Sequence, residues 1–216
     1  MTYVKEKIVS WRKDFGQFSV KDTADALKGW KMQGKPGTRK AVFSIESDNE
    51  QELSYLRMRA DRASGSLITS VDGVDLEKTP ILRWRWRALK LPKGADGRYR
   101  SKDDQAIGIY VGTGSAIDNK SVSYRWDTDT PKGTEGEAYY GLGGVKIKWY
   151  TLRNAEDGVG SKWYVEERNV ADDFRRAWGF CPEKIYLAVS CNSQYTKSSA
   201  IADLEWIEFA GEDDRK

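Results

Sequence analysis

Arginine recurs at every second position in two segments of this sequence. In residues 80–89 it alternates with leucine, tryptophan and alanine, and residues 53–61 repeat the pattern. Because successive side chains of a β-strand point to opposite faces, this spacing predicts sheets with one apolar and one cationic face. A guanidinium donates hydrogen bonds in a planar fork that matches carboxylates, sulfates and adjacent hydroxyls. Such a face is suited to a polyhydroxylated or anionic polymer, and it is equally typical of a solvated sheet with cross-strand ion pairs.

Tyrosine and glutamate extend the predicted polar face. On one predicted strand, Tyr164, Glu166 and Arg168 share this face. Trp163 and Val165 of the same strand are expected on the apolar face. We expect sugar rings to stack on tyrosine or on a tryptophan at the rim, while arginine binds hydroxyl groups. The candidate ligand-binding residues are Arg57, Arg85, Tyr110, Arg125, Tyr164, Glu166 and Arg168.

The tryptophans that alternate with basic residues are expected to fill the core between two sheets. Trp84 and Trp86 alternate with arginine, and each aromatic side chain buries a large area. In residues 144–152 the same reasoning sets Val145, Ile147 and Trp149 on the apolar face.

The groups available for catalysis are limited, because the sequence contains no histidine. This excludes Ser-His-Asp and Cys-His centres and zinc sites that need imidazole. If the protein is an enzyme, Tyr164, Glu166 and Arg168 are its expected catalytic residues, as a polysaccharide lyase before a glycoside hydrolase. A glycosidase needs two carboxylates about 5–5.5 Å or about 6.5–9.5 Å apart. Adjacent Glu166 and Glu167 point to opposite faces of a strand and are a poor pair.

A loop rich in glycine and aspartate precedes one predicted strand. Asp103 and Asp104 are adjacent there, and Asp96 lies seven residues before Asp103. Such loops supply the oxygen ligands that Ca²⁺ prefers, although the spacing matches no EF-hand. Turn and capping roles are the alternative for these aspartates.

The elements that must position these residues are nearly all strands. Short segments with period-two alternation are separated by turns rich in Gly, Pro, Asp and Asn, which is typical of an all-β sandwich. We predict strands at residues 41–47, 53–61, 65–71, 80–89, 106–112, 121–127, 144–152, 161–170, 184–190 and 201–210. One connecting helix is predicted at 170–180, ending at Gly179. The predicted fold is an antiparallel β-sandwich of jelly-roll type.

Length and composition fit one soluble domain. The chain has 216 residues, of which 32% are charged and 39% hydrophobic. We expect a single sandwich over residues 1–216, with residues 1–40 packed on it and residues 211–216 forming a frayed tail. No run of 18 apolar residues exists, so no membrane span is expected. We expect a monomer.

Charge and cysteine content bound the partners and the compartment. The formal net charge of +3 does not by itself argue for a nucleic-acid partner. Acids interrupt the basic strands and no RRM, KH or OB signature is present, so nucleic acid is not expected. Cys181 and Cys191 are compatible with one disulfide or with two reduced thiols. The first residues lack the apolar stretch of a signal peptide, so the protein is either cytoplasmic or its signal segment is missing from this sequence.

Four separated blocks resemble one bacterial family. They are the RWRWR strand, the LPKGADGR turn, the KDDQAIGIYV strand and the EERNVADDF segment, in that order. Over about residues 40–210 the sequence resembles the DUF3047 family. The chain departs from the family pattern in SCNSQYTKSS, where Cys191 and Asn192 replace acidic residues, and this weakens a metal or catalytic role for that loop.

The resemblance implies a jelly-roll domain similar to carbohydrate-binding modules, in a protein that is periplasmic or secreted. Such modules often hold a structural calcium ion with acids near both chain ends, and here Asp22, Asp203 and Glu205 would be the ligands. No other cofactor is expected. The leading hypothesis is a module that binds a polysaccharide or oligosaccharide through the Arg/Tyr face without catalysis. A polysaccharide-active enzyme using the same face and a protein-interaction scaffold are the alternatives.

Overall fold

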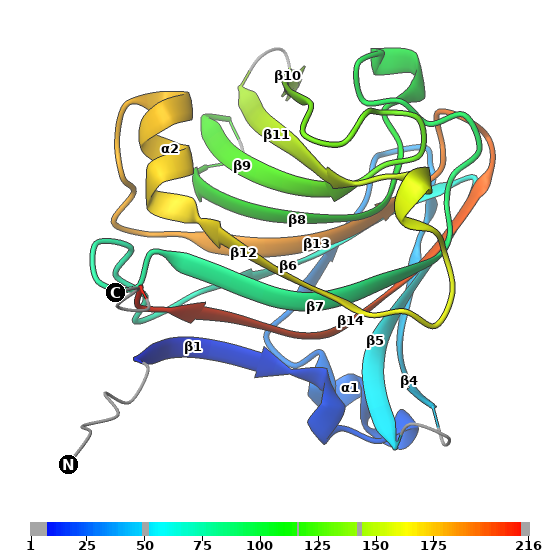
Figure 1. The fold of residues 1–216 in the computed structure, drawn as a ribbon, viewed down its shortest axis with the longest axis horizontal. Helices are drawn as coiled ribbons and strands as arrows, with labels where there is room; N and C mark the ends of the chain where they lie inside the picture. Colours follow the sequence, from blue (N-terminus) through cyan, green and yellow to red (C-terminus); the bar gives the residue numbers. More distant parts are fainter. Residues whose placement is uncertain (1–7, 49–51, 116, 142–143, 213–216) are drawn as a thin grey trace.

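The computed structural model describes residues 8–48, 52–115, 117–141 and 144–212, and it shows two packed β-sheets (Figure 1). Sheet A has six strands in the order β12-β7-β14-β5-β4, with β1 beside β14. Its strands are β1 (Val9–Asp14), β4 (Val42–Asp48), β5 (Leu53–Asp61), β7 (Ile81–Lys90), β12 (Tyr164–Asn169) and β14 (Ser199–Ala210). The predicted β-sandwich of jelly-roll type is confirmed.

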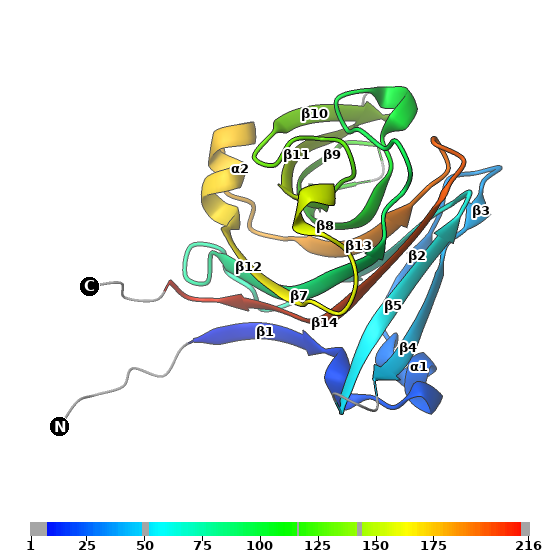
Figure 2. The same ribbon diagram turned by 45° about the vertical axis from the view of Figure 1, so that its right-hand side comes forward.

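Sheet B has eight strands in the order β10-β11-β9-β8-β13-β6-β2, with β3 beside β6. Its strands are β2 (Lys31–Gln33), β3 (Arg39–Lys40), β6 (Ala63–Ser70), β8 (Gln105–Gly114), β9 (Asn119–Trp126), β10 (Glu135–Tyr140), β11 (Val145–Arg153) and β13 (Tyr186–Asn192). Figure 2 shows that this sheet curls, so that β10 and β11 rise over one face of β8 and β13. The curl makes one face of sheet B concave.

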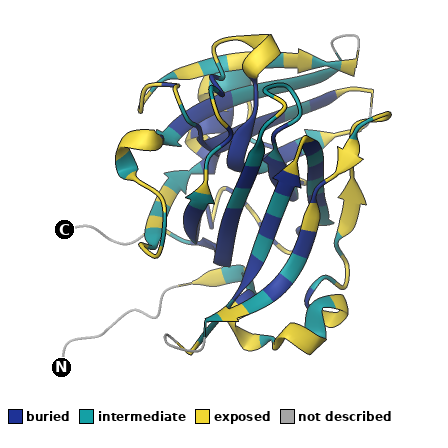
Figure 3. Ribbon diagram, turned by 90° about the vertical axis from the view of Figure 1, so that its right-hand side faces the viewer, coloured by how far each residue is buried: buried dark blue, intermediate teal, exposed yellow. Residues whose placement is uncertain are grey.

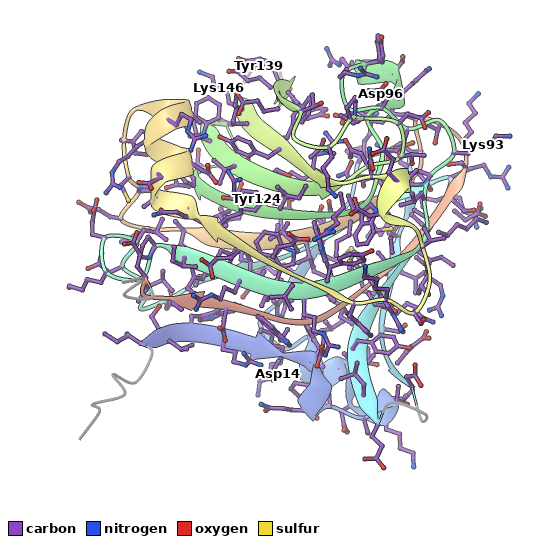
Figure 4. The ribbon with its side chains drawn as sticks, in the orientation of Figure 1. Asp14, Lys93, Asp96, Tyr124, Tyr139 and Lys146 are labelled. Carbon is purple, nitrogen blue, oxygen red and sulfur yellow. The ribbon has the colours of Figure 1, made fainter. Side chains whose placement is uncertain are left out.

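The core lies between the two sheets and is dominated by aromatic rings. Trp84 and Trp86 of β7 are fully buried, as predicted. Trp84 stacks on Tyr124 of β9 with ring centroids 5.3 Å apart, and Trp86 meets the edge of Trp126 at 5.7 Å. Tyr124 is seen between the sheets in Figure 4. Because each ring buries a large apolar area, these contacts tie sheet A to sheet B.

Two helices connect strands at the margins. α2 (Val170–Trp178) begins after Asn169, whose side chain accepts a hydrogen bond from the Asp172 amide at 3.0 Å. It ends at Gly179, which has the left-handed φ of 79° that glycine tolerates. The predicted helix at 170–180 is confirmed. α1 (Thr23–Ala26) is a single turn, and short 3₁₀ helices occupy Phe15–Gln17, Val20–Asp22, Arg100–Lys102 and Ala155–Asp157.

Two pairings are parallel in a sandwich that is otherwise antiparallel. β11 pairs with β9 and β3 pairs with β6 in this way. β10 was not predicted, because its first three residues, EGE, continue a turn segment rich in Gly and Pro, and alternate positions of the strand are exposed. β1, β2 and β3 also lie outside the predicted strands. Figure 3 shows the buried positions gathered in the strands and the exposed ones in loops and helical turns.

Cys181 and Cys191 are both free thiols. Burial raises the pKa of the Cys191 thiol, which keeps it protonated and unreactive at neutral pH. None of the described helices is long and apolar enough to cross a membrane. Most of the predicted frayed tail, residues 213–216, lies outside the described residues.

Candidate functional site

A groove lies on the concave face of sheet B, on the side turned away from the core. Its volume is about 580 Å³, and β2, β6, β8, β9, β10, β11 and β13 all contribute to its lining. The groove is hollow because its floor carries small side chains. Ser66 of β6 and Ala188 and Ser190 of β13 line the cavity, together with Trp149 of β11 and Tyr140 of β10. The hollow is therefore built by residue size as well as by the curl of the sheet.

Aromatic rings on this face of sheet B lie over glycines. A β-carbon added to these glycines would lie 2.7, 2.2 and 2.2 Å from the nearest ring atom, which is closer than real contacts allow. The pairs are Tyr110 over Gly108, Tyr186 over Gly112 and Trp149 over Gly136. Glycine is thus required where each ring approaches the backbone, and the rings cover sheet that would otherwise have no side chain.

Arg125 is a fixed cation at one end of the groove. Its side chain donates to Asp127 at 3.0 Å and pairs with Asp103 at 2.7 Å, and the residue is only 2% exposed. Desolvation opposes its charge, but the charges of Asp127 and Asp103 outweigh burial and raise the pKa of the guanidinium. The guanidinium also lies over the Trp149 ring, 5.2 Å from its centroid. Arg125 therefore holds the acids and the indole in place.

Tyr110 and Tyr140 of the groove are hydrogen-bonded and neutral. Gln105 donates through its side-chain amide to the Tyr110 hydroxyl at 2.7 Å and to Ser190 at 3.2 Å. Tyr140 donates its hydroxyl to Asp103. Burial raises the pKa of both Tyr110 and Tyr140 above the ordinary value of about 10. Neither phenol is suited to acting as a base near neutral pH.

The adjacent aspartates before β8 position the two sides of the groove. Asp103 holds Arg125 on β9 through the ion pair described above. Asp104 accepts hydrogen bonds from the backbone amides of Tyr195 at 3.2 Å and Thr196 at 2.7 Å, in the connection between β13 and β14. Tyr195 in turn lines the groove. Asp103 therefore holds a side chain of β9, and Asp104 holds the connection between β13 and β14.

The seven predicted ligand-binding residues do not share one face. Tyr110 and Arg125 line the groove of sheet B. Arg57 and Arg85 lie on the outer face of sheet A, and Tyr164, Glu166 and Arg168 lie on β12, at the edge of the sandwich. The expected single Arg/Tyr face is wrong, because the strands that carry these residues belong to two different sheets.

The outer face of sheet A carries a charged cluster that we call the ladder, made of Arg57, Arg83, Arg85, Arg87, Asp203 and Glu205. Asp203 binds Arg57 and Arg87 at 2.7 Å each, and Arg85 pairs with Glu205 at 2.5 Å. The Arg87 guanidinium also lies 4.4 Å from the centroid of the Trp163 ring. These guanidinium groups are engaged by carboxylates, and we leave Arg57 and Arg85 out of the candidate site.

The face predicted for β12 is reversed. Tyr164 points into the sandwich, where its ring meets Trp126 at a centroid distance of 5.4 Å. Val165 is 57% exposed, and Trp163 packs on the outer face against Arg87. Glu166 and Arg168 share the inward side with Tyr164 because they are two and four positions further along the strand.

The polar groups of β12 are occupied by structural partners. Glu166 accepts hydrogen bonds from Arg153 at 2.6 Å and from the Trp86 indole at 3.2 Å. Arg168 pairs with Asp173 of α2 at 2.7 Å. These contacts close the edge of the sandwich, and they oppose the catalytic role expected for Tyr164, Glu166 and Arg168.

The face predicted for β11 is also reversed. Val145, Ile147 and Trp149 line the groove instead of the core. Tyr150 is the residue that points to the sandwich side, where it stacks on Tyr124 at 6.0 Å. The alternation identified the two faces correctly, but it does not tell which of them meets the other sheet.

The residues proposed for calcium do not form a cluster. Asp22 accepts hydrogen bonds from Ser19, whereas Asp203 and Glu205 are paired with arginines in the ladder. The loop acids are likewise engaged, Asp96 by Arg98, Asp103 by Arg125 and Asp104 by two backbone amides. Within the described residues, no group of three or more His, Cys, Asp or Glu side chains is placed to hold a metal ion.

Several groove residues were missed by the sequence reasoning. They are Gln105, Tyr140, Trp149, Gln194 and Tyr195. Among the described side chains, the Trp149 indole N–H and the Gln194 side-chain oxygen are buried without a hydrogen-bond partner. A signal for Trp149 existed in Gly136, since a glycine inside a strand marks a close approach of another group.

Comparison with known proteins gives a family and several distant structures. A family model described as "Protein of unknown function (DUF3047)" matches residues 28–208. No curated protein matches the sequence.

Solved structures with a similar arrangement share little sequence with this chain. The family 11 carbohydrate-binding module of a cellulosomal cellulase of Clostridium thermocellum has 11% identity and a TM-score of 0.49, over 97% of this chain and 98% of the module. A carbohydrate esterase of bacteriophage phi24B has 11% identity and a TM-score of 0.49, over 96% of this chain and 100% of the esterase chain. The enzymatically active domain of tailspike protein 4 from bacteriophage CBA120 has 10% identity and a TM-score of 0.43 over 92% of this chain, which spans only 21% of that chain.

Proposed function

We propose that this chain, which belongs to the DUF3047 family, is a glycan-binding protein that holds a polysaccharide or oligosaccharide in the groove of sheet B. One observation carries the proposal: the groove brings aromatic rings seated over glycines together with polar groups held in place by hydrogen bonds. Its binding residues would be Tyr110, Arg125, Tyr140, Trp149 and Gln105.

The chemistry of this lining fits a sugar. A pyranose ring has an apolar C–H face, which stacks on aromatic rings, and a rim of hydroxyl groups, which need polar partners. Trp149 and Tyr110 supply the rings, and Ser66, Ser190 and Gln105 supply neutral polar groups. The unpartnered indole N–H of Trp149 is a donor suited to a ligand oxygen. The volume of about 580 Å³ falls in the range of about 300–1,000 Å³ that is usual for ligand sites.

Two properties of the groove favour binding over catalysis: the number of its carboxylates and the protonation state of Tyr110 and Tyr140. A hydrolase would need two carboxylates flanking the ligand, whereas Asp103 is the one carboxylate among the described residues that line the groove. A lyase that uses tyrosine as its base would need a phenol that ionises near neutral pH, and burial shifts the pKa of Tyr110 and Tyr140 the other way. The side chains of the groove therefore suit the binding of a sugar better than its cleavage.

The proposal is tested by filling the groove. Ser66→Trp places a large ring over the floor of the groove, and Ser44→Trp is the matched control on the outer face of sheet A. Affinity electrophoresis in gels containing a panel of soluble polysaccharides would first identify a retarding glycan. We expect Ser66→Trp to weaken that retardation by at least about tenfold in affinity, the equivalent of about 1.4 kcal/mol, and Ser44→Trp to leave it unchanged.

Two outcomes contradict this function. Absence of retardation with every glycan, together with co-purification of a protein partner, would favour an interaction scaffold. A steady rise in absorbance from unsaturated products with uronate-containing polysaccharides would instead make the protein a lyase.

A further inference from the structure

Arg100 differs from the other arginines of this protein. Over the described ranges, each of the others has a carboxylate partner in an ion pair, from Arg12 on β1 to Arg176 on α2. Arg100 forms no ion pair with any described residue, although it lies in the connection between β7 and β8, close to Asp103. It is exposed, and its side chain lines the groove of sheet B. Its charge therefore remains available to a ligand.

A second cation lines the same groove from another connection. Lys35, between β2 and β3, contacts Tyr195, with its ammonium 4.6 Å from the ring centroid and 3.5 Å from the hydroxyl. No carboxylate among the described residues pairs with it. Since Tyr195 is itself anchored by Asp104, the contact holds Lys35 at the side of the groove.

The acidic group of the groove does not offset these two charges. Asp103 pairs with Arg125 at 2.7 Å, and it also accepts the hydrogen bond from Tyr140. Arg125 is shared with Asp127, so these three groups together carry one formal negative charge. Lys35 and Arg100 carry two positive charges, so the region keeps a net positive charge, which favours a negatively charged ligand.

We propose that the glycan bound in the groove is acidic, and that Lys35 and Arg100 hold its carboxylate groups. The inference rests on the proposed function. A guanidinium fork matches the two oxygens of a carboxylate, and an ammonium adds a point charge. The substrate class is therefore a polymer of uronic acids or a glycan with uronic acid branches, and the aromatic rings of the groove stack on the sugar faces.

The test uses two ligands that share one sugar backbone and differ in charge. Polygalacturonate carries a carboxylate on each sugar, and its methyl ester has the same backbone without that charge. We expect the wild-type chain to bind polygalacturonate at least about tenfold more tightly than the ester in isothermal titration at low salt. Raising the salt from about 0.01 M to about 1 M shortens the Debye length from about 30 Å to about 3 Å, so the preference should shrink.

Three variants locate the preference. Arg100→Gln and Lys35→Gln should each lower the affinity for polygalacturonate about two- to fivefold, and the double variant about tenfold, with binding of the ester unchanged. Lys93→Gln is the matched control. Lys93, labelled in Figure 4, is exposed in the same β7–β8 connection and is not among the residues that line the groove. Its removal should change neither affinity.

The possible failures are distinguishable. Equal binding of polygalacturonate and its ester would overturn the acidic-glycan inference and leave the proposed function standing. If the protein bound neither these ligands nor any neutral glycan, both the acidic-glycan inference and the proposed function would be wrong. A preference for dextran sulfate over dextran that exceeds the polygalacturonate preference would overturn the assignment to carboxylates. If Lys93→Gln lowered the affinity for polygalacturonate as much as the groove variants do, general surface charge, and not the groove, would cause the preference.

Discussion

Sheet A and sheet B each turn one face away from the core, and both of these faces carry arginine beside carboxylates and aromatic rings. On sheet A, Asp203 lies between Arg57 and Arg87 and is completely buried. On sheet B, Arg125 is paired with carboxylates in the same way, yet Ser190 and Ser66, further along the same row of side chains across the sheet, are small and leave the space above them open. In the ladder, the guanidinium groups are engaged by carboxylates of the protein. The groove is open because the side chains on its floor are small.

The comparison teaches that arginine spacing alone does not mark a binding face. A cation serves a ligand only where a carboxylate of the protein does not already occupy it and where neighbouring side chains leave room. In the ladder, Trp163 even covers Arg87, with 4.4 Å between the guanidinium and the ring centroid. We therefore expect changes in the ladder to alter stability and changes in the groove to alter binding.

The largest expected effect is on the ladder. Asp203→Asn removes the carboxylate that binds two guanidinium groups, and Arg87 would then keep a buried charge without its partner. Breaking a buried ion pair in this way lowers the free energy of unfolding by about 3–5 kcal/mol. Urea unfolding followed by tryptophan fluorescence measures the change.

The control is Asp72→Asn at an exposed position, which should change the free energy of unfolding by less than about 0.5 kcal/mol. Glycan affinity of folded Asp203→Asn should equal that of the wild type. A loss of glycan binding without a loss of stability would reverse the roles assigned to the two faces.

A smaller effect is expected from a change within sheet B. Gly136→Ala places a β-carbon where the Trp149 ring now lies, 2.2 Å from its nearest atom. The ring must shift, which lowers the free energy of unfolding by about 1–3 kcal/mol and also weakens glycan binding. Gly211→Ala is the control, because its β-carbon would meet its nearest neighbour at 3.6 Å. Unchanged affinity in a destabilised Gly136→Ala variant would show that Trp149 does not contact the ligand.

The two regions should also respond differently to pH, and this is the smallest expected effect. Burial raises the pKa of Tyr110 and Tyr140, so both phenols stay protonated up to at least pH about 10. Binding of a neutral glycan, measured by titration between about pH 6 and pH 9, should therefore be constant. A rise in affinity or in turnover with increasing pH would mean that a phenol ionises in the groove.

Beside the ladder, the sign of the pH effect is set by Glu46. Burial opposes its ionisation, but hydrogen bonding from Arg59 and the charges of Arg57 and Arg59 outweigh burial and lower the pKa of Glu46. The unfolded chain then binds the proton more readily, so this contribution to stability is present above pH about 4.3 and is lost as the pH falls through the lower folded value. Thermal unfolding of Glu46→Gln against wild type at pH about 7 and about 3 measures it, and a difference that grows toward acid pH would contradict this sign.

The alternation of the sequence predicted the central strands and the buried face of β7 well. The bounds of β5 match the predicted strand at 53–61, and Trp84 and Trp86 are fully buried. These are local properties, because the period of two follows from the backbone of a single strand.

The composition of the groove could not be predicted in the same way. Arg85 and Arg125 lie in similar sequence patterns, but β7 belongs to sheet A and β9 to sheet B. Which strands share a sheet is decided by long-range packing. Val145 and Trp149 were assigned to the core because they alternate with lysine, but hydrophobicity does not distinguish a groove wall from a core.

The alternation along β13 has a consequence for how this protein could diversify. Ala188 and Ser190 face the groove, while Leu187 and Val189, which alternate with them, are buried in the core. The residues that shape the groove and the residues that fill the core therefore alternate along one strand. Selection can enlarge one set of residues and leave the other set unchanged, so the proposed site can acquire a new ligand without loss of the fold.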